Sequence, residues 1–128
     1  MSKFSLSKKS ESRLVGVHPD LVAVVRRAIE ITEVDFSVGE GLRTIERQKE
    51  LVAKGASQTM KSRHLTGHAV DLYAIVDSTV SWEWKYYAKI SESVSKASKE
   101  LGVDVEWGGN WKMKDGPHFQ LTWAKYPK

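Results

Sequence analysis

The chain of 128 residues has the length of one domain, and its 41% hydrophobic and 9% aromatic residues allow a buried core. Because it contains no cysteine, the sequence excludes a disulfide framework, a cysteine-ligated metal and a thiol nucleophile, so any metal ligand must be His, Asp or Glu. The formal net charge of +4 favours anionic surfaces without choosing among nucleic acid, phospholipid and wall polymer.

Helical and strand-like patterns follow one another along the whole chain. The expected elements, in chain order, are a loosely ordered basic arm (1–15), a helix opened by Pro19-Asp20, a strand (35–38), a helix (45–54) capped by Thr44, a strand (69–73), a long helix capped by Ser81 and closed by Gly102, and strands over 103–107 and 118–121. Since these do not alternate as regular βαβ units, we predict an α+β fold with a small, mostly antiparallel sheet flanked by helices. The whole chain, 1–128, is expected to be a single domain.

The N-terminal residues contain no apolar stretch of signal-peptide length. The longest apolar run, Leu21–Val25, is far shorter than the ~18 residues that indicate a membrane span. We therefore expect the chain to stay in the cytosol until another protein releases it.

A first chemical motif runs from Ser62 to Leu72 with the sequence SRHLTGHAVDL. His64 is expected in a loop and Asp71 within a strand, which is an unfavourable place for an aspartate and therefore a possible sign of function. Imidazole and carboxylate both bind zinc, and the turn at Gly67 could bring them to one metal. The alternative is a solvent-facing aspartate beside a surface histidine.

A second motif joins Trp107-Gly108-Gly109-Asn110-Trp111 to Asp115-Gly116-Pro117-His118-Phe119-Gln120. In a strand starting at His118, Phe119 faces the core while His118 and Gln120 face the other side. Together with His64 and Asp71, His118 completes a set of two histidines and one carboxylate, which leaves a fourth tetrahedral position open, as in catalytic zinc sites.

These motifs carry a family resemblance that covers the chain from about Pro19 to Gln120. The strings SxHxxGxAxD (Ser62 to Asp71), WGGxW, DxPHF and the GxRT-like Gly41-Leu42-Arg43-Thr44 resemble the zinc D-Ala-D-Ala carboxypeptidase-like peptidases, whose fold is shared by hedgehog-type domains. The chain is most similar to the branch of phage endolysins that cut the L-alanyl–D-glutamate bond of peptidoglycan.

The resemblance implies a role for each matching residue. The zinc ligands would be His64, Asp71 and His118, with Asp115 as general base and Arg43 holding the polarised carbonyl oxygen. Ser62 would lie at the site edge, and His68 and Gln120 are expected to contact substrate. For Asp115 the alternative is a plain turn residue, with Glu40 and Glu106 as rival bases, and for Arg43 it is an ion pair with Glu40 or Glu46.

The resemblance also implies a function. We expect a zinc-dependent peptidoglycan endopeptidase that binds one Zn²⁺ per chain, acts as a monomer on stem peptides in the periplasm and causes host lysis after a separate holin-type protein releases it. Neither a nucleic-acid partner nor stable membrane insertion is expected. The alternatives are a bacterial D,D- or L,D-carboxypeptidase of wall remodelling and a non-catalytic zinc-binding module of the same fold.

Overall fold

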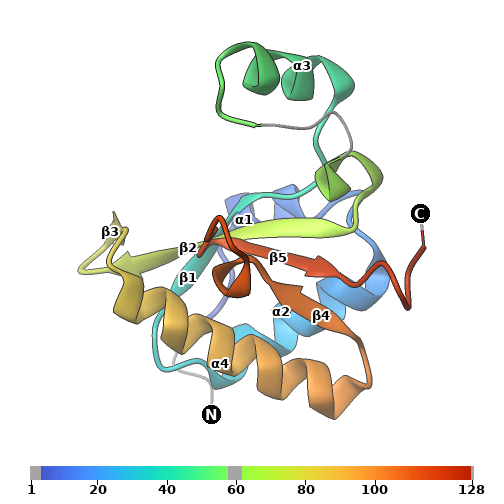
Figure 1. The fold of residues 1–128 in the computed structure, drawn as a ribbon. Helices are drawn as coiled ribbons and strands as arrows, with labels where there is room; N and C mark the ends of the chain where they lie inside the picture. Colours follow the sequence, from blue (N-terminus) through green and yellow to red (C-terminus); the bar gives the residue numbers. More distant parts are fainter. Residues whose placement is uncertain (1–3, 58–61, 128) are drawn as a thin grey trace.

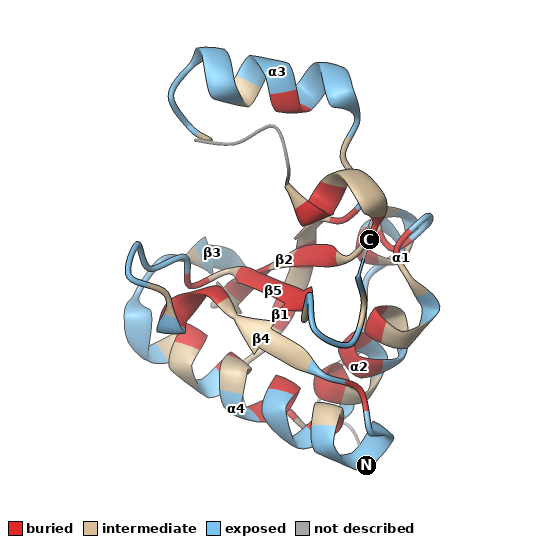
Figure 2. Cartoon of the chain, turned by 45° about the vertical axis from the view of Figure 1, so that its right-hand side comes forward, coloured by how far each residue is buried: buried red, intermediate tan, exposed pale blue. Residues whose placement is uncertain are grey.

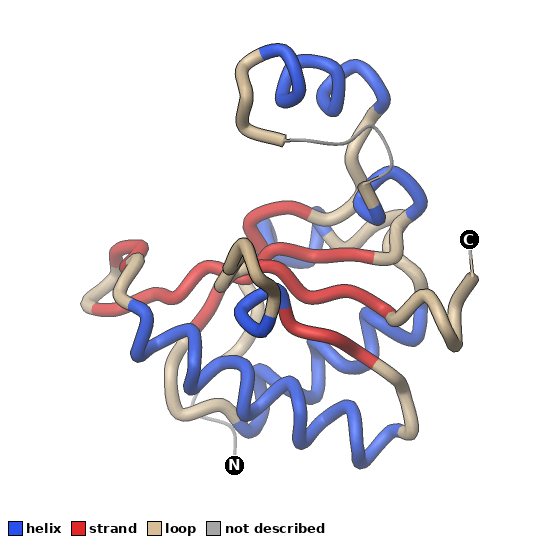
Figure 3. Tube along the Cα trace, viewed as in Figure 1, coloured by secondary structure: helices blue, strands red, loops and turns tan. Residues whose placement is uncertain are grey.

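The computed structural model describes residues 4–57 and 62–127. Its elements in chain order are α1 (Lys8–Arg13), α2 (Pro19–Ile31), β1 (Phe36–Glu40), α3 (Ile45–Ala53), the 3₁₀ turn η1 (Arg63–Thr66), β2 (Ala69–Val76), β3 (Thr79–Ser81), α4 (Trp84–Leu101), β4 (Val105–Trp107), the 3₁₀ turn η2 (Gly108–Asn110) and β5 (His118–Leu121). Figure 1 shows α2 and α4 together on one side of the sheet and α3 projecting from the other side. Figure 3 gives the same view by element type.

The sheet has the strand order β1-β2-β5-β4, with β3 pairing beside β2, and all of its neighbouring strands are antiparallel. This confirms the predicted α+β class. The register places Asp71 opposite His118 on the central pair, and Glu106 opposite Gln120 on the next pair. Because directly opposed residues put their side chains on the same face, this register brings two of the predicted metal ligands together.

The core lies between the sheet and the helices α2 and α4. Period-two alternation turns Val70, Leu72 and Phe119 into this core, so that Asp71 and His118 face the opposite side. The same core takes the apolar stripe of α2, which Pro19 opens and the side chain of His18 caps. Figure 2 shows the contrast between this buried body and the largely exposed α3.

Two expected features differ in the structure. Residues 8–13 lie in the expected loose arm but form α1, where Ser10 is buried and its hydroxyl accepts a hydrogen bond of 2.9 Å from the backbone N–H of Val38. Because β1 is an edge strand, the N–H of Val38 would otherwise have no partner strand on that side, and the Ser10 hydroxyl satisfies it. The long helix begins at Trp84 rather than directly after Ser81, because residues 79–81 pair with β2 as the unforeseen strand β3.

The short helix α3 begins at Ile45 with Thr44 as its N-cap, as predicted. Its glutamine Gln48 is fully buried, although most of the helix is exposed. Within the described ranges, 4–57 and 62–127, no helix has the length and apolar character needed to cross a bilayer.

Candidate metal centre and active site

Three predicted ligands converge on the face of the sheet opposite α2 and α4. His64 comes from η1, Asp71 from β2 and His118 from β5, and one ligand atom from each lies within 4.8 Å of the others. His64 Nε2 and His118 Nδ1 both lie 3.3 Å from Asp71 Oδ1. Ligand bonds of 2.0–2.2 Å in a tetrahedral site would separate neighbouring ligand atoms by about 3.4 Å. The Asp71 oxygen therefore lies at the distance from each ring nitrogen that a tetrahedral metal site requires, and the two nitrogens are at most 4.8 Å apart.

The opposite ring nitrogens fix which nitrogen of each histidine can bind a metal. His64 Nδ1 lies 2.8 Å from the carbonyl oxygen of Gly41, which can only accept, so Nδ1 carries the proton. His118 Nε2 lies 2.7 Å from Gln120 Oε1 and donates in the same way. Each neutral ring then turns a lone pair toward the carboxylate of Asp71. Acceptors that converge in this way need a proton or a cation between them, so the donor set fits a metal ion.

The electrostatics of the metal-free cluster show the same need for positive charge. Burial alone would raise the pKa of Asp71, but hydrogen bonds from His118 and His64 hold it well below its usual range. Burial lowers the pKa of His118, yet the hydrogen bond and charge of Asp71, with the contact to Gln120, leave it above its usual value. Without a metal, Asp71 favours the protonated form of His118.

A second layer of groups orients His118. Gln120 Nε2 donates to Glu106 Oε1 at 3.2 Å, and this bond turns the amide oxygen of Gln120 toward His118. The other oxygen of Glu106 accepts from Trp111 Nε1 at 3.1 Å, and the Trp111 ring lies 5.0 Å from the His118 ring. Gln120, predicted as a substrate contact, lines the pocket, but its amide is engaged on both sides within the protein.

Arg43 lies in the same pocket and is held rigidly. Its Nε and Nη2 donate to the two oxygens of Glu40 at 2.8 and 2.6 Å, and its Nη1 donates to Gln48 Oε1 at 2.7 Å. The ion pair with Glu40 that we considered as the alternative is thus present, in the pocket that contains the predicted metal ligands. Burial lowers the pKa of Arg43, but the hydrogen bond and charge of Glu40, together with the charge of Asp71, leave it above its usual value. The arginine therefore places a permanent positive charge at the site.

Asp115 stands on the rim of the pocket that contains the three ligands. Its backbone N–H donates to Gly108 O at 2.9 Å, and a Cβ on Gly108 would lie only 2.5 Å from Asp115 O, so the turn needs glycine there. Partial desolvation, then the negative charge of Asp71, raise the pKa of Asp115, while His118, His64 and Arg43 lower it. The carboxylates of the rival bases are already engaged within the protein. Glu40 forms an ion pair with Arg43, and Glu106 accepts hydrogen bonds from Gln120 and Trp111.

The remaining predicted site residues take different places. Ser62 lines the pocket, and its hydroxyl accepts from the N–H of His64 at 3.2 Å and from Arg43 Nη1 at 3.4 Å. The ring nitrogen Nδ1 of His68 lies 2.6 Å from Thr66 Oγ1, and its ring is 5.5 Å from that of His18, outside the described lining of the pocket. Gly67 ends η1 in a left-handed conformation, and this turn separates His64, in the pocket, from His68, outside its lining.

The pocket has a volume of about 690 Å³ and includes residues that sequence reasoning did not assign to the site. These are Arg47, Leu51, Ala56, Ser57, Arg63, Tyr73, Trp111 and Trp123. Several of them belong to α3 and the segment after it, which reach the pocket across space. No local pattern in the sequence marks such contacts, although the position of Arg63 directly before His64 was a usable signal.

A pocket with two histidines, a carboxylate, a rigid arginine and a rim carboxylate defines a metallohydrolase-type site on an α+β fold. The family model for phage L-alanyl-D-glutamate peptidase matches residues 1–122. The L-alanyl-D-glutamate peptidase of Escherichia phage T5 is 30% identical over 127 residues, covering 96% of this chain and 93% of that protein. The chain belongs to the phage L-alanyl-D-glutamate peptidase family, as its motifs predicted.

Two further relatives agree with this assignment. The L-alanyl-D-glutamate peptidase of Listeria phage A118 is 38% identical over 108 residues, which cover 81% of this chain but only 37% of that longer protein. The crystal structure of the L-Ala D-Glu endopeptidase ChiX from Serratia marcescens matches with a TM-score of 0.93 and 56% identity, covering 98% of this chain and 96% of ChiX. The fold prediction is thereby confirmed against a solved structure.

Proposed function

We propose that this chain is a single-domain, zinc-dependent endopeptidase that hydrolyses the L-Ala–D-Glu bond of peptidoglycan stem peptides. The observation that carries the proposal is the convergence of His64, Asp71 and His118, whose ligand atoms lie within 4.8 Å of one another, in one pocket with Asp115 and Arg43. Membership of the peptidase family supports the choice of bond. Two imidazoles and one carboxylate without thiolate match the ligands of catalytic zinc sites, which supports zinc.

In this proposal each residue has a defined task. A zinc ion held by the three ligands supplies Lewis-acid polarisation of the scissile carbonyl and activation of water at neutral pH. Asp115 accepts the proton of the attacking water and passes it to the departing amine. Its raised pKa suits this exchange, because a general base works best with a pKa nearer the operating pH.

Arg43 stabilises the negative charge that develops on the carbonyl oxygen. Its two bonds to Glu40 and the bond to Gln48 fix the guanidinium before the substrate arrives, and such preorganisation is the main source of electrostatic catalysis. Ser62 at the pocket edge supports Arg43 and the start of η1. His68 remains a proposed contact for the more distant part of the substrate.

For Gln120 we propose a positioning role through His118. Its amide oxygen accepts from His118 Nε2 and its amide nitrogen donates to Glu106, so that the Nδ1 lone pair of His118 points at the metal position. Hydrogen bonds of this kind to metal-bound histidines set ring orientation and affinity.

The proposed biological setting follows the phage relatives. The chain would act as a monomer on the wall in the periplasm, after waiting in the host cytoplasm for release by a holin-type protein, and would cause lysis. A carboxypeptidase is the weaker alternative, because the relatives are named for an internal bond. A non-catalytic module is weaker still, since Asp115 and Arg43 both line the pocket.

The test uses purified sacculi incubated with the zinc-loaded protein, with the chelated protein and with the chelated protein given back zinc. The proposal expects soluble peptide from the first and third samples only. Equal release from the chelated protein would contradict metal dependence, and no release from any sample would contradict the endopeptidase activity.

A further inference from the structure

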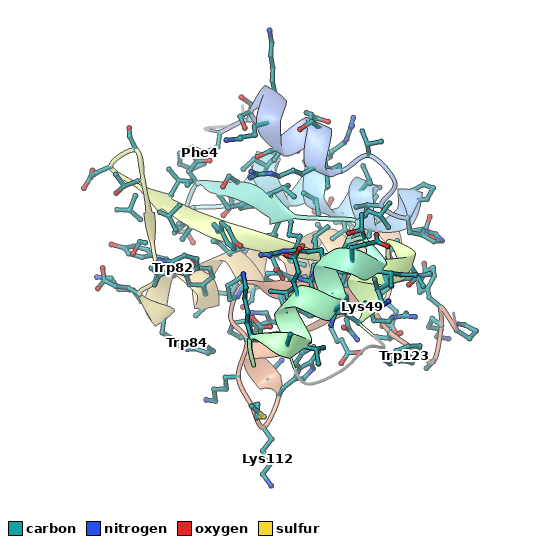
Figure 4. All side chains as sticks on the ribbon, turned by 90° about the horizontal axis from the view of Figure 1, so that it is seen from above. Phe4, Lys49, Trp82, Trp84, Lys112 and Trp123 are labelled. Atoms are coloured by element: carbon teal, nitrogen blue, oxygen red, sulfur yellow. The ribbon has the colours of Figure 1, made fainter. Side chains whose placement is uncertain are left out.

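Two exposed tryptophans, Trp82 and Trp84, lie close to the active-site pocket. Trp82 precedes α4 and is 66% exposed, and Trp84 is the first residue of α4 and is 45% exposed. Figure 4, which looks down on α3, shows both on the same side of that helix, with Trp123 on the other side. Large aromatic side chains that are exposed next to one another commonly mark a contact with a ligand or partner.

Ring contacts connect Trp82 to the wall of the pocket. Tyr73 lines the pocket and lies two residues after Asp71 on β2, so the two side chains share one face of the sheet. The rings of Tyr73 and Trp82 meet edge to face, with centroids 5.1 Å apart. The ring of Tyr87 lies nearly parallel to that of Trp82, at an interplanar angle of 8° and a centroid distance of 6.2 Å. These contacts hold Trp82 as a fixed extension of the pocket wall.

Trp84 is attached to the loop that carries Asp115. Its ring stacks on Trp107 with centroids 5.3 Å apart, and Trp107 Nε1 donates to the carbonyl oxygen of Gly116, directly after Asp115, at 2.7 Å. A Cβ on Gly116 would lie 3.3 Å from the Trp84 ring, so the ring rests against this backbone. Unlike the indole of Trp107, those of Trp82 and Trp84 donate no hydrogen bond to any residue that the structure describes.

The proposed substrate carries a sugar at a matching distance. In peptidoglycan, the L-Ala residue before the cleaved bond is joined through a lactyl group to an N-acetylated amino sugar. L-Ala and the lactyl group together span two residue lengths, or about 7 Å. Asp71 and Tyr73 are also two residues apart, about 7 Å along β2, and Trp82 adjoins Tyr73. A sugar attached to a stem peptide in the pocket therefore reaches the tryptophans.

We propose that Trp82 and Trp84 form a platform on which the glycan strand of the substrate stacks. Sugar rings have a face of C–H groups that packs on flat aromatic rings, and their acetamido carbonyls accept hydrogen bonds from indole N–H groups. The ring contacts fix the platform before the substrate binds, which lowers the entropy cost of binding. Attachment to the pocket wall and to the Asp115 loop favours the substrate's own glycan over a lipid surface. This inference rests on the proposed function.

The test compares two substrates with the same stem peptide, a muropeptide that keeps its disaccharide and a peptide with an acetyl group in place of the lactyl sugar. Trp82→Ala should raise KM for the muropeptide about 3- to 10-fold, as the loss of one aromatic stacking contact predicts, and leave kcat/KM for the sugar-free peptide unchanged. Trp82→Phe, which keeps an aromatic ring, should restore most of the loss. Leu101→Ala is the control, because Leu101 is exposed at the other end of α4, outside the pocket lining, and it should change neither value.

A binding measurement decides the question without a variant, should Trp82→Ala fail to fold. The wild type is titrated with a peptide-free oligosaccharide of N-acetylglucosamine, and the indole N–H signals are followed by NMR. The signals of Trp82 and Trp84 should shift while that of Trp123 stays in place. Shifts confined to Trp123, or no shift, would overturn the platform.

The outcomes separate the inference from the proposed function. An equal loss on both substrates in Trp82→Ala would show that Trp82 only supports Tyr73, and would overturn the platform. Unchanged KM on both substrates would also overturn it, and loss of binding to vesicles of anionic phospholipid in the same variant would then assign the tryptophans to a membrane. A wild type that cleaves neither substrate would overturn the proposed function, whereas the oligosaccharide titration would still support or overturn the platform.

Discussion

Replacing Gln120 by leucine tests how the protein prepares His118 for a metal. The two side chains have similar volumes, so the main loss is the pair of hydrogen bonds, 2.7 Å to His118 and 3.2 Å to Glu106. His118 is only 7% exposed, so its Nε2–H would be left without a partner in a buried place. Such an orphaned group costs about 1–3 kcal/mol, which we expect as the loss of unfolding free energy in the metal-free protein.

Zinc affinity should fall as well, because the His118 ring is no longer fixed. Loss of a hydrogen bond to a metal-bound histidine lowers affinity about 10- to 100-fold, or roughly 1.4–2.8 kcal/mol. Competition with a chromophoric chelator measures the affinity, and urea unfolding of the metal-free protein measures the stability. Thr122→Val is the control, because Thr122 donates to Asp104 at an exposed position one residue beyond the strand.

The reasoning would be refuted if Gln120→Leu bound zinc as tightly as the wild type while remaining folded. It would be equally refuted if Thr122→Val lowered zinc affinity by the same factor, since the effect would then belong to the strand end and not to the bond with His118.

Three further predictions concern the base, the arginine and pH. Asp115→Asn should keep the fold and the zinc content of the wild type but lose about 10²- to 10⁴-fold in kcat, measured on a stem peptide; near-normal kcat would place the base elsewhere. Glu40→Gln should loosen Arg43 and lower kcat about 10-fold at unchanged zinc content, and unchanged kcat would speak against preorganisation by Glu40. In the metal-free protein, the pKa of His118 in the folded state lies above its unfolded value of 6.5. Protonated His118 therefore stabilises the fold fully below pH 6.5, and this stabilisation is lost as the pH rises through the folded-state pKa. The melting temperature of metal-free protein should therefore fall on going from mildly acidic to alkaline pH, whereas the stabilisation by added zinc should grow; parallel pH profiles with and without zinc would contradict this coupling.

Part of the convergence of the predicted metal ligands follows from the alternation of side chains along a strand, which depends only on local sequence. Once residues 69–73 and 118–121 are taken as strands, Val70 and Phe119 must face the core and Asp71 and His118 must share the other face. The pairing of β2 with β5, which puts Asp71 opposite His118, and the approach of His64 are seen only in the structure. The family resemblance added the roles of Asp115 and Arg43, which spacing alone does not provide.

Other features depend on contacts that no local pattern shows. The strand β3 follows a two-residue turn at Asp77 and Ser78, both with positive φ of 51° and 66°, and this pair is a weaker hairpin signal than Asn-Gly. Helix α1 is too short to be stable alone and depends on Ser10 bonding Val38, 28 residues away. The contact between Glu106 and Gln120 could likewise not be predicted, because it depends on the register between β4 and β5.

The central claim, that this site cuts the L-Ala–D-Glu bond with the help of a metal, is tested most directly by mass spectrometry of peptidoglycan fragments. The account predicts that zinc-loaded protein releases stem peptides that begin with D-Glu and leaves L-Ala on the glycan strands. The same digest with Asp115→Asn should show almost none of these fragments. Release of free D-Ala as the sole product, or of the same D-Glu peptides by metal-free protein, would contradict the account.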